Sequence, residues 1–410
     1  MAAQLIGHLD ADCFYVSCER VRSQVLAFQP VGVLGNQGAC VIAKSYEMKA
    51  MGVKTGMPIW DAVKLCPNGI YVKRDFRWYE AISRRLLEAV KLASPHVEYY
   101  SIDEMFFDGQ HLEQVMGQPL LTAARTLQQQ ILQKIGVPVS MGISLTKTLA
   151  KLISDTAKPL GCAVLLDSTA IQELLDKTPV GEISGIGKRS EQKLAAHEIL
   201  NCGHFAKADR RLIRKLLTVR GEHLWWELHG TPTQPILTRR PPHKCISRGG
   251  SLGGATADPD RLIAWAVRNV ERLIEELDYY EVFTSQVTLA LELKKGGGWS
   301  GRVVLPHATS SFSIIASDVK SLLMDAIQLN KQFTGMHLLA EKLCIRSLVQ
   351  RNLFEECDPQ MDRIANVKAL INQQVGRFAL RSGDTLALGD IYADQSNEYD
   401  ICDVHGKMCF

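Results

Sequence analysis

The stretch YYSIDEMFFDG, residues 99–109, places two adjacent carboxylates inside an aromatic run with the character of a β-strand. Side chains alternate between the two faces of an ideal strand, so Asp103 and Glu104 reach one site only if the strand breaks there. We therefore expect a tight hairpin turn or bulge at residues 102–105. Burying both charges is costly unless a cation neutralises them, and a bound metal would do so. A surface hairpin with solvated acids is the alternative that this stretch alone leaves open.

A second acidic strand end lies near the N-terminus. The apolar run LIGHL at residues 5–9 is followed directly by DADCFY at residues 10–15, so the Asp10 carboxylate emerges where a strand ends. Together with the acids of the first stretch it can hold a pair of divalent cations. Oxygen-only ligation favours Mg²⁺ or Mn²⁺ over zinc, and two such ions about 3.5–4 Å apart form the usual clamp for in-line phosphoryl transfer.

Length and composition are those of a globular protein with several cores. The 410 residues exceed the ~100–200 typical of one domain, so we expect two to four domains. The net charge of +3 is small, so any affinity for nucleic acid must come from local basic patches. The 11 cysteines are scattered without C-x₂-C pairs, and no secretory signal is recognisable. No apolar run approaches the ~20 residues of a membrane span. We expect a cytoplasmic protein with no membrane partner.

The segment after the first acidic strand predicts a phosphate-contacting face. Residues 38–52 have the pattern of a helix ended by glycine, on which Tyr46 and Lys49 share a face. An aromatic hydroxyl beside an ammonium suits a triphosphate, although a solvated lysine is the commoner outcome for such a pair. Further helices are expected at residues 80–92 and 120–135.

A stripe of lysines follows the next strand. Residues 139–144 have the pattern of a strand, and residues 146–158 that of the helix after it. Lys147, Lys151 and Lys158 fall on one stripe of this helix. Such a stripe is usually a solvated face. Its place after a strand, in a chain with a candidate metal site, favours a phosphate contact at Lys158.

A short helical domain carries a second phosphate-binding pattern. In VGEISGIGKRS, residues 180–190, the glycines Gly185 and Gly187 precede Lys188 and Arg189. This resembles a helix-hairpin-helix, whose glycines let backbone N–H groups approach a phosphate at a helix N-terminus. A helix C-cap turn is the alternative, but the basic segment at residues 209–215 favours a sequence-independent grip on DNA.

The last ordered pattern follows a proline-rich joint at residues 239–242. It reads β-α-β-β-α-β, a ferredoxin-like order, with the elements expected at residues 244–252, 259–277, 284–294, 299–305, 317–329 and 336–349. Basic residues on these strands would form an outer face that follows a nucleic-acid backbone, namely Arg248, Lys294, Lys295 and Arg302. An isolated sheet with ordinary surface lysines explains the same pattern equally well.

Five stretches, in this order and spacing, resemble the Y-family of translesion DNA polymerases. They are HLDADCFYVSCE (8–19), VIAKSYEMKAMGVKTGMP (41–58), YYSIDEMFFD (99–108), SLTKTLAKLISDTAKPLG (144–161) and GEISGIGKRSEQKL (181–194). The resemblance runs from Met1 to Val349 and is greatest to the bacterial UmuC-like branch. It implies an α+β right-hand polymerase with palm, fingers, a helical thumb and a little finger.

The resemblance also assigns roles to single residues. Asp10, Asp103 and Glu104 match the catalytic, metal-binding carboxylates, and the main-chain carbonyl of Ala11 would complete the coordination of two Mg²⁺ ions. Tyr15 matches the steric gate against ribonucleotides. The residues matching those that contact the incoming dNTP are Phe14, Tyr15, Tyr46, Lys49 and Lys158, although the family more often has arginine at the Lys49 position.

The expected domains follow from the same resemblance. They are the palm (1–21 and 76–167), the fingers (22–75), the thumb with its helix-hairpin-helix (168–238), the little finger (239–349), and a tail (350–410). The tail opens with QRNLF, which is similar to the peptide that docks bacterial polymerases on the sliding clamp through Gln350, Leu353 and Phe354. Only a helix at residues 361–375 is expected beyond it.

The main hypothesis is a translesion DNA polymerase acting on primer–template DNA and dNTPs in SOS-type damage tolerance. Further partners implied by the resemblance are the sliding clamp, an UmuD-like subunit and a recombinase filament. One alternative is a non-catalytic accessory of the repair machinery that binds DNA and clamp. Loss of a carboxylate would favour it, and all three are present. A nucleotidyl cyclase is the other alternative, but it has no evident use for a helix-hairpin-helix or a clamp peptide.

Overall fold

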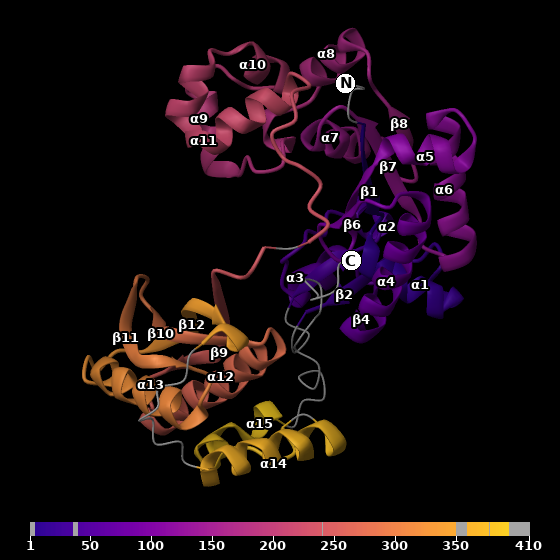
Figure 1. The fold of residues 1–410 in the computed structure, drawn as a ribbon. Coiled ribbons are helices and arrows are strands. Elements are labelled where there is room, and N and C mark those ends of the chain that lie inside the picture. Colours follow the sequence, from indigo (N-terminus) through magenta and orange to yellow (C-terminus); the bar gives the residue numbers. More distant parts are fainter. Residues whose placement is uncertain (1–4, 36–39, 240, 350–358, 377, 393–410) are drawn as a thin grey trace. The chain divides into compact units, whose positions relative to one another are not determined.

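The chain is drawn in Figure 1 as a computed structural model, which describes residues 5–35, 40–239, 241–349, 359–376 and 378–392. The described residues form two compact units, one before residue 240 and the other from Pro241 onward. Helices and strands occur in both units, in agreement with the α+β class. Within the described residues, no helix is long and apolar enough to span a membrane.

A five-stranded sheet organises the first unit. Its strands, in spatial order, are β5 (Val97–Tyr99), β6 (Glu104–Asp108), β1 (Ile6–Ala11), β7 (Val139–Ser144) and β8 (Cys162–Val164). The central strand β1 is antiparallel to both neighbours, and only β7 and β8 are parallel. The expected hairpin is present, because β5 pairs with β6, but its turn lies at residues 100–103 rather than at 102–105, since Glu104 and Met105 already belong to β6.

One face of this sheet is apolar and is covered by three helices. Leu9 and Met141 belong to one large buried cluster with side chains of the covering helices, which are α4 (Phe76–Ala93), α5 (Gly109–Met116) and α6 (Leu120–Ile135). Alternation along the strands explains the division: odd-numbered positions of β1 point to these helices, and even-numbered positions point away. The expected helices at residues 80–92 and 120–135 are confirmed.

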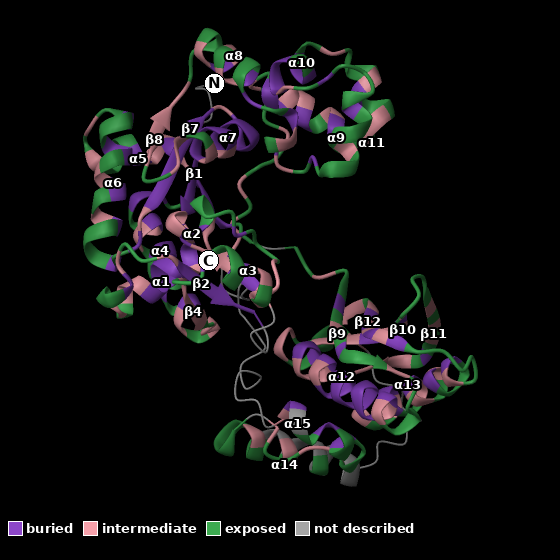
Figure 2. Cartoon of the chain, turned by 180° about the vertical axis from the view of Figure 1, so that it is seen from behind, coloured by how far each residue is buried: buried purple, intermediate pink, exposed green. Residues whose placement is uncertain are grey.

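Helix α7 (Lys147–Ala157) covers the other face and packs on β1 and β7. Gly142 makes this approach possible, because a Cβ there would lie 2.3 Å from the main-chain oxygen of Ala150. Figure 2 shows α7 and the strands beneath it largely buried. The polar residues at even positions of β1, His8 and Asp10, therefore lie between the sheet and the lysine-bearing helix.

A smaller sheet corrects one expectation. Residues 38–52 were expected to form one helix, but β3 (Val41–Lys44) and α2 (Tyr46–Ala50) share this segment, with Ser45 capping the helix. The apolar start, Val41-Ile42, pairs with β2 (Val31–Leu34), so tertiary pairing outweighs the helical pattern there. The remaining elements of this part are α1 (Phe14–Arg22), α3 (Ile59–Leu65) and β4 (Ile70–Lys73), with β4 parallel to β2.

A helical part completes the first unit. It contains α8 (Ser168–Lys177), α9 (Lys188–Ala195), α10 (Cys202–Lys207) and α11 (Arg210–Leu228), with a 3₁₀ turn at Val180–Glu182. Gly185 has φ +96°, a conformation natural to glycine, and Gly187 is the N-cap of α9. The segment around these glycines is therefore a turn into a helix N-terminus, as the pattern predicts.

The second unit has the expected β-α-β-β-α-β order. Its elements are β9 (Cys245–Thr256), α12 (Pro259–Tyr279), β10 (Val282–Leu293), β11 (Gly298–Thr309), α13 (Phe312–Ile327) and β12 (Phe333–Ile345). The four strands form an antiparallel sheet in the order β11-β10-β12-β9. Apolar side chains on one face of this sheet form a buried cluster with those of α12 and α13.

The tail contributes to the second unit's core. The expected helix at residues 361–375 is present as α14 (Pro359–Val375), followed by a 3₁₀ helix at Gly383–Leu388 and by α15 (Gly389–Tyr392). Leu388 is fully buried and Ile391 nearly so, both in the cluster that contains α12. No pattern in the sequence predicted that these residues complete a core.

Candidate active site

Three carboxylates meet where the central strands of the first unit end. In the strand register Asp10 lies directly opposite Glu104, the first residue of β6. Asp103 immediately precedes β6, and its main-chain oxygen accepts a hydrogen bond of 2.9 Å from the Ala11 N–H. Because the strand begins only at Glu104, the alternation rule does not separate Asp103 from it. The structure thus brings the predicted residues Asp10, Ala11, Asp103 and Glu104 to one strand end.

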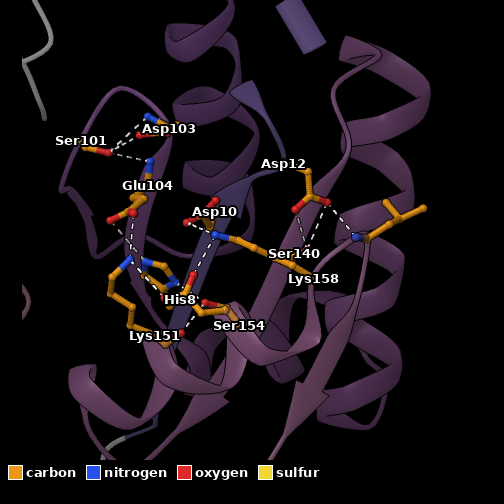
Figure 3. A network of polar contacts seen from close by, with 12 residues as sticks. His8, Asp10, Asp12, Ser101, Asp103, Glu104, Ser140, Lys151, Ser154 and Lys158 are labelled. Atoms are coloured by element: carbon orange, nitrogen blue, oxygen red, sulfur yellow. Dashed lines mark hydrogen bonds and ion pairs between the residues drawn. The ribbon is translucent and has the colours of Figure 1, made fainter. Parts of the chain in front are cut away.

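Two lysines from the α7 segment engage two of these carboxylates, as Figure 3 shows. The Lys158 ammonium lies 2.7 Å from Asp10 Oδ2, and the Lys151 ammonium lies 2.8 Å from Glu104 Oε1. Asp103 Oδ1 instead accepts a hydrogen bond of 2.5 Å from the Ser101 hydroxyl. Across the described residues, no three His, Cys, Asp or Glu side chains form a ready-made metal cage.

The acidity of the three carboxyls reflects this arrangement. Burial raises the pKa of Asp10 to about 7 against the opposing charge of Lys158, and the neighbouring Glu104 and Asp103 add to the rise. Burial also raises the pKa of Asp103. At Glu104 burial is outweighed by the contact with His8 and the charge of Lys151, which lower its pKa to about 2.

The donor set fits divalent cations of the magnesium type. All side-chain donors are carboxylate oxygens from adjacent strand ends, and ammonium groups compensate the negative charge of Asp10 and Glu104. A metal ion bound between the carboxylates would neutralise their charge in place of the lysines, and neither strand would have to unfold. Lys158, at the C-terminal cap of α7 and about a quarter exposed, would then be able to turn to another anion.

Tyr15, the expected steric gate, is the second residue of α1, which follows the end of β1. Its ring stacks on Tyr79, with centroids 4.6 Å apart and planes inclined by 21°, and contacts the edge of Phe76 at 5.8 Å. Tyr79 is held in turn by a hydrogen bond of 2.7 Å to Glu19. The ring of Tyr15 is therefore fixed from behind and remains partly exposed in front. The side chain of Phe14 is only 4% exposed and belongs to the core, so the expected nucleotide contact of this residue would have to come from its main chain and stays a prediction.

The residues expected to contact the triphosphate come from two elements. Tyr46 in α2 donates a hydrogen bond of 3.3 Å to Asp12 Oδ1, and Lys49 one turn later is exposed. Burial lowers the pKa of Lys44, and the positive charge of nearby Lys49 lowers it further. The expected lysine stripe needs one correction: Lys147 is buried and pairs with Glu98, so it cannot meet a phosphate.

Two site residues escaped the sequence analysis. His8 is fully buried on β1, where its Nδ1 lies 2.6 Å from the Ser154 hydroxyl and its Nε2 lies 3.8 Å from Glu104 Oε2. Asp12, also buried, joins Tyr46 to β7 and to the segment after α7. The spacing of residues 8, 10 and 12, which alternate along and just beyond one strand, indicates that they share a face. It does not indicate the partners of His8 and Asp12, which lie more than 30 residues away in the sequence.

The expected DNA contacts divide into two sets. In the first unit Gly185, Gly187, Lys188 and Arg189 are all exposed at the turn into α9. Their main-chain and charged groups can therefore meet a phosphate backbone from one side.

In the second unit, one of the basic residues expected on the outer face of the sheet does not lie there. Lys294 and Arg302 are exposed on the sheet face away from the helices. Arg248 is different, because its guanidinium pairs with Glu276 of α12 and its neighbour across the sheet, Leu338, is buried against the helices. The expected grouping of Arg248 with Lys294 on one face is wrong. The expected clamp residues Gln350, Leu353 and Phe354 lie outside the described residues.

Comparisons with known proteins agree with this geometry. The sequence profile of the impB/mucB/samB family matches residues 9–155, and that of the family's C-terminal domain matches residues 243–353. The chain belongs to the impB/mucB/samB family, the Y-family DNA polymerases. It is accordingly a DNA-directed DNA polymerase of the translesion class.

Its relatives carry two kinds of name. DNA polymerase IV of Oceanobacillus iheyensis is 38% identical over 66% of this chain and 66% of its own length. DNA polymerase IV 1 of Bacillus subtilis is 27% identical over 94% of both chains. Protein ImpB of Salmonella typhimurium is 33% identical over 68% of this chain and 67% of its own. Because both names occur among the relatives, the UmuC-like branch stays a prediction.

Solved structures show the same fold. A Y-family polymerase chimera of Dbh and Dpo4 superposes with a TM-score of 0.73 at 22% identity and covers 83% of this chain and 99% of its own. An insertion ternary complex of Dbh DNA polymerase gives a TM-score of 0.55 at 21% identity, with the same coverage. The right-hand polymerase fold expected from the sequence is therefore confirmed.

Proposed function

We propose that this polymerase transfers nucleotides by a two-metal mechanism centred on Asp10, Asp103 and Glu104. One observation carries the proposal: the three carboxylates share one strand end, directly opposite the lysines of the α7 segment. Two bound Mg²⁺ ions would supply an activated primer 3′-hydroxyl and charge neutralisation for the departing pyrophosphate. Mn²⁺ suits the same oxygen donors.

The chain's own residues prepare the nucleotide for this reaction. With Asp10 engaged in holding a metal, the ammonium of Lys158 would be available to contact the triphosphate together with Tyr46 and Lys49. Tyr15, supported by Tyr79, lies under the deoxyribose and leaves no room for a 2′-hydroxyl. These contacts position the substrate and select its sugar, whereas the carboxylates hold the reacting centre.

Domain roles follow from the same proposal. The five-stranded sheet with α4 to α7 serves as palm, the small sheet with α2 and α3 as fingers, α8 to α11 as thumb, and residues 239–349 as little finger. The exposed turn into α9 and the outer face with Lys294 then hold the primer–template backbone.

The partners of this activity remain part of the proposal. We place the sliding clamp at Gln350, Leu353 and Phe354, and an UmuD-like subunit and a recombinase filament as further partners in SOS-type mutagenic repair. Changing the three peptide residues to Ala should remove stimulation by the clamp and leave distributive synthesis intact. Survival of the stimulation would move the docking site elsewhere.

Primer extension on undamaged and abasic templates tests the proposed function. In Mg²⁺ the protein should add a nucleotide opposite both, and chelation of the metal should stop both reactions. If neither Mg²⁺ nor Mn²⁺ supports nucleotide addition although the protein still binds DNA, the protein would instead be a non-catalytic accessory.

A further inference from the structure

Asp12 is a buried carboxylate that the two-metal mechanism does not use. Its side chain follows β1 and is 2% exposed. It points away from Glu104 to the far side of Lys158, as Figure 3 shows. Hydrogen bonds from neighbouring elements compensate the burial of this charge, and the positive charge of nearby Lys158 assists them.

Three donors from three separate segments provide these hydrogen bonds. The Ser140 hydroxyl of β7 lies 3.0 and 3.1 Å from the two carboxylate oxygens. The main-chain N–H of Leu160 donates at 2.7 Å, and the Tyr46 hydroxyl of α2 donates at 3.3 Å. Asp12 thus connects the central sheet with both segments that carry the proposed triphosphate contacts.

The bond to Leu160 fixes the segment that contains Lys158. Leu160 has φ +50°, a conformation that residues other than glycine rarely adopt. The short hydrogen bond from its N–H to Asp12 holds the chain in this turn two residues after Lys158. The direction in which the Lys158 side chain leaves the backbone therefore depends on Asp12.

The hydrogen bond from Tyr46 differs from the others in its length and in the exposure of its donor. At 3.3 Å it is the longest of the four contacts, and it comes from a side chain that is partly exposed. A phosphate oxygen near the hydroxyl could take over as acceptor. Asp12 would keep the donors Ser140 and Leu160, so the exchange leaves no buried charge uncompensated.

We propose that Asp12 is a positioning residue for the triphosphate end of the incoming nucleotide. It orients Tyr46 until the nucleotide accepts the hydroxyl's hydrogen bond, and it fixes the turn that aims Lys158. The inference rests on the proposed role of Tyr46 and Lys158 as triphosphate contacts. It assigns Asp12 no contact with metal, substrate or the reacting atoms.

Steady-state kinetics of Asp12→Asn test the proposal. The amide keeps the shape of the side chain but offers one acceptor oxygen instead of two. We expect KM for dNTP to rise about tenfold, kcat to change less than about threefold, and the Kd for primer–template to stay unchanged. The matched control is Asp108→Asn, where another carboxylate accepts a backbone N–H, from Gln110, and where no change in KM is expected.

Tyr46→Phe distinguishes positioning from general structural support. If Asp12 acts partly through the Tyr46 hydroxyl, the double variant Asp12→Asn/Tyr46→Phe should show a smaller KM increase than the product of the two single effects. Equal losses in KM, kcat and DNA binding would mean that Asp12 only supports folding, and would overturn the inference. Should Asp12→Asn fail to fold, Ser140→Ala carries the test, with an expected KM increase of about threefold. An unchanged KM in that variant would also overturn it.

Lys158→Ala separates this inference from the proposed function. A raised KM in Lys158→Ala and Tyr46→Phe, with an unchanged KM in Asp12→Asn, would overturn the role of Asp12 alone. If neither Lys158→Ala nor Tyr46→Phe raises KM, the proposed triphosphate contacts are wrong and this inference fails with them.

Discussion

At the scale of single residues, the proposed mechanism gives the carboxylates the reacting centre and gives Tyr15 the exclusion of ribonucleotides. Tyr15 carries no carboxylate and lies five positions after Asp10. Its ring is backed by Tyr79 at 4.6 Å, so it cannot retreat when a bulkier sugar enters. Discrimination against ribonucleotides would then arise from steric exclusion rather than from a hydrogen bond.

Tyr15→Ala tests this exclusion. Ribonucleotide incorporation should rise by about tenfold, roughly 1.4 kcal/mol of lost discrimination, while deoxynucleotide addition falls much less. Single-nucleotide kinetics with paired dNTP and rNTP measure both. The control Tyr79→Phe keeps the supporting ring, removes only the hydroxyl bound to Glu19, and should preserve the discrimination. Equal losses for both sugars in Tyr15→Ala would reduce Tyr15 to a packing residue.

The sequence predicts the clustered carboxylates better than the residues that support them. The sequence alone points to Asp10, Asp103 and Glu104, because an acid at the end of an apolar strand conflicts with the burial expected there. The sequence does not predict the roles of His8 and Asp12, because their partners Ser154 and Ser140 lie more than 120 residues away. Only the sheet register brings them together.

At the scale of elements, α7 connects the candidate active site with the helical part of the first unit. Glu227, at the end of α11, is fully buried and accepts hydrogen bonds from the Thr148 N–H at the start of α7 and from the N–H groups of Thr233 and Gln234. One carboxylate thus joins two helix ends and the chain that leads out of the unit. The negative charge also suits the N-terminus of α7.

Glu227→Ala should therefore loosen this junction. Stranding one buried and two partly buried N–H donors is expected to cost about 3 kcal/mol of stability, measured by urea denaturation, and to reduce amide-exchange protection in peptides covering residues 146–157. Glu173→Ala, at an exposed position of α8, should change stability by less than about 0.5 kcal/mol. Unchanged protection of α7 in Glu227→Ala would refute the junction.

The tail shows a limit of predicting structure from sequence patterns. Helix α14 was predictable from its periodicity, but the burial of Leu388 depends on a groove formed by α12, more than 100 residues earlier. The small sheet makes the same point, since Val41 and Ile42 form a strand only because β2 is available as a partner. In both cases a contact distant in sequence decides the outcome.

Leu388→Ala tests whether the tail belongs to the second unit's core. Removing a fully buried leucine side chain should cost about 2–5 kcal/mol in the unfolding transition of that unit. Leu386, two positions earlier, is 72% exposed, and Leu386→Ala is the matched control with an expected change below about 0.5 kcal/mol. Equal small effects of both changes would show that the tail only lies against the surface.

At the scale of the whole molecule, we expect DNA binding to be distributed over exposed basic groups in both units. The chain's net charge of +3 provides no strong overall field, so affinity must depend on local contacts such as those at Lys188, Arg189 and Lys294. Each phosphate contact releases counterions, which makes the affinity dependent on salt.

The salt dependence of DNA affinity measures these contacts. In the double variant Lys188→Ala/Arg189→Ala, the slope of log K against log salt should become less steep by about 2, that is about 1 per lost contact. Lys134→Ala changes an exposed lysine at the end of α6, on the opposite side of the sheet from α7, and should leave the slope unaltered. A slope insensitive to the double change would exclude the turn into α9 from the DNA-binding surface.

Nucleotide addition by Asp103→Ala and Glu104→Ala tests the two-metal assignment most directly. Each variant should bind primer–template with the affinity of the unmodified protein and lose at least about a thousandfold in single-nucleotide incorporation with Mg²⁺. Glu113→Ala, an exposed acid on α5, is the control and should retain full activity. Incorporation by either variant within about tenfold of the unmodified protein, a barrier change of only ~1.4 kcal/mol, would contradict the assignment of these carboxylates to the reacting centre.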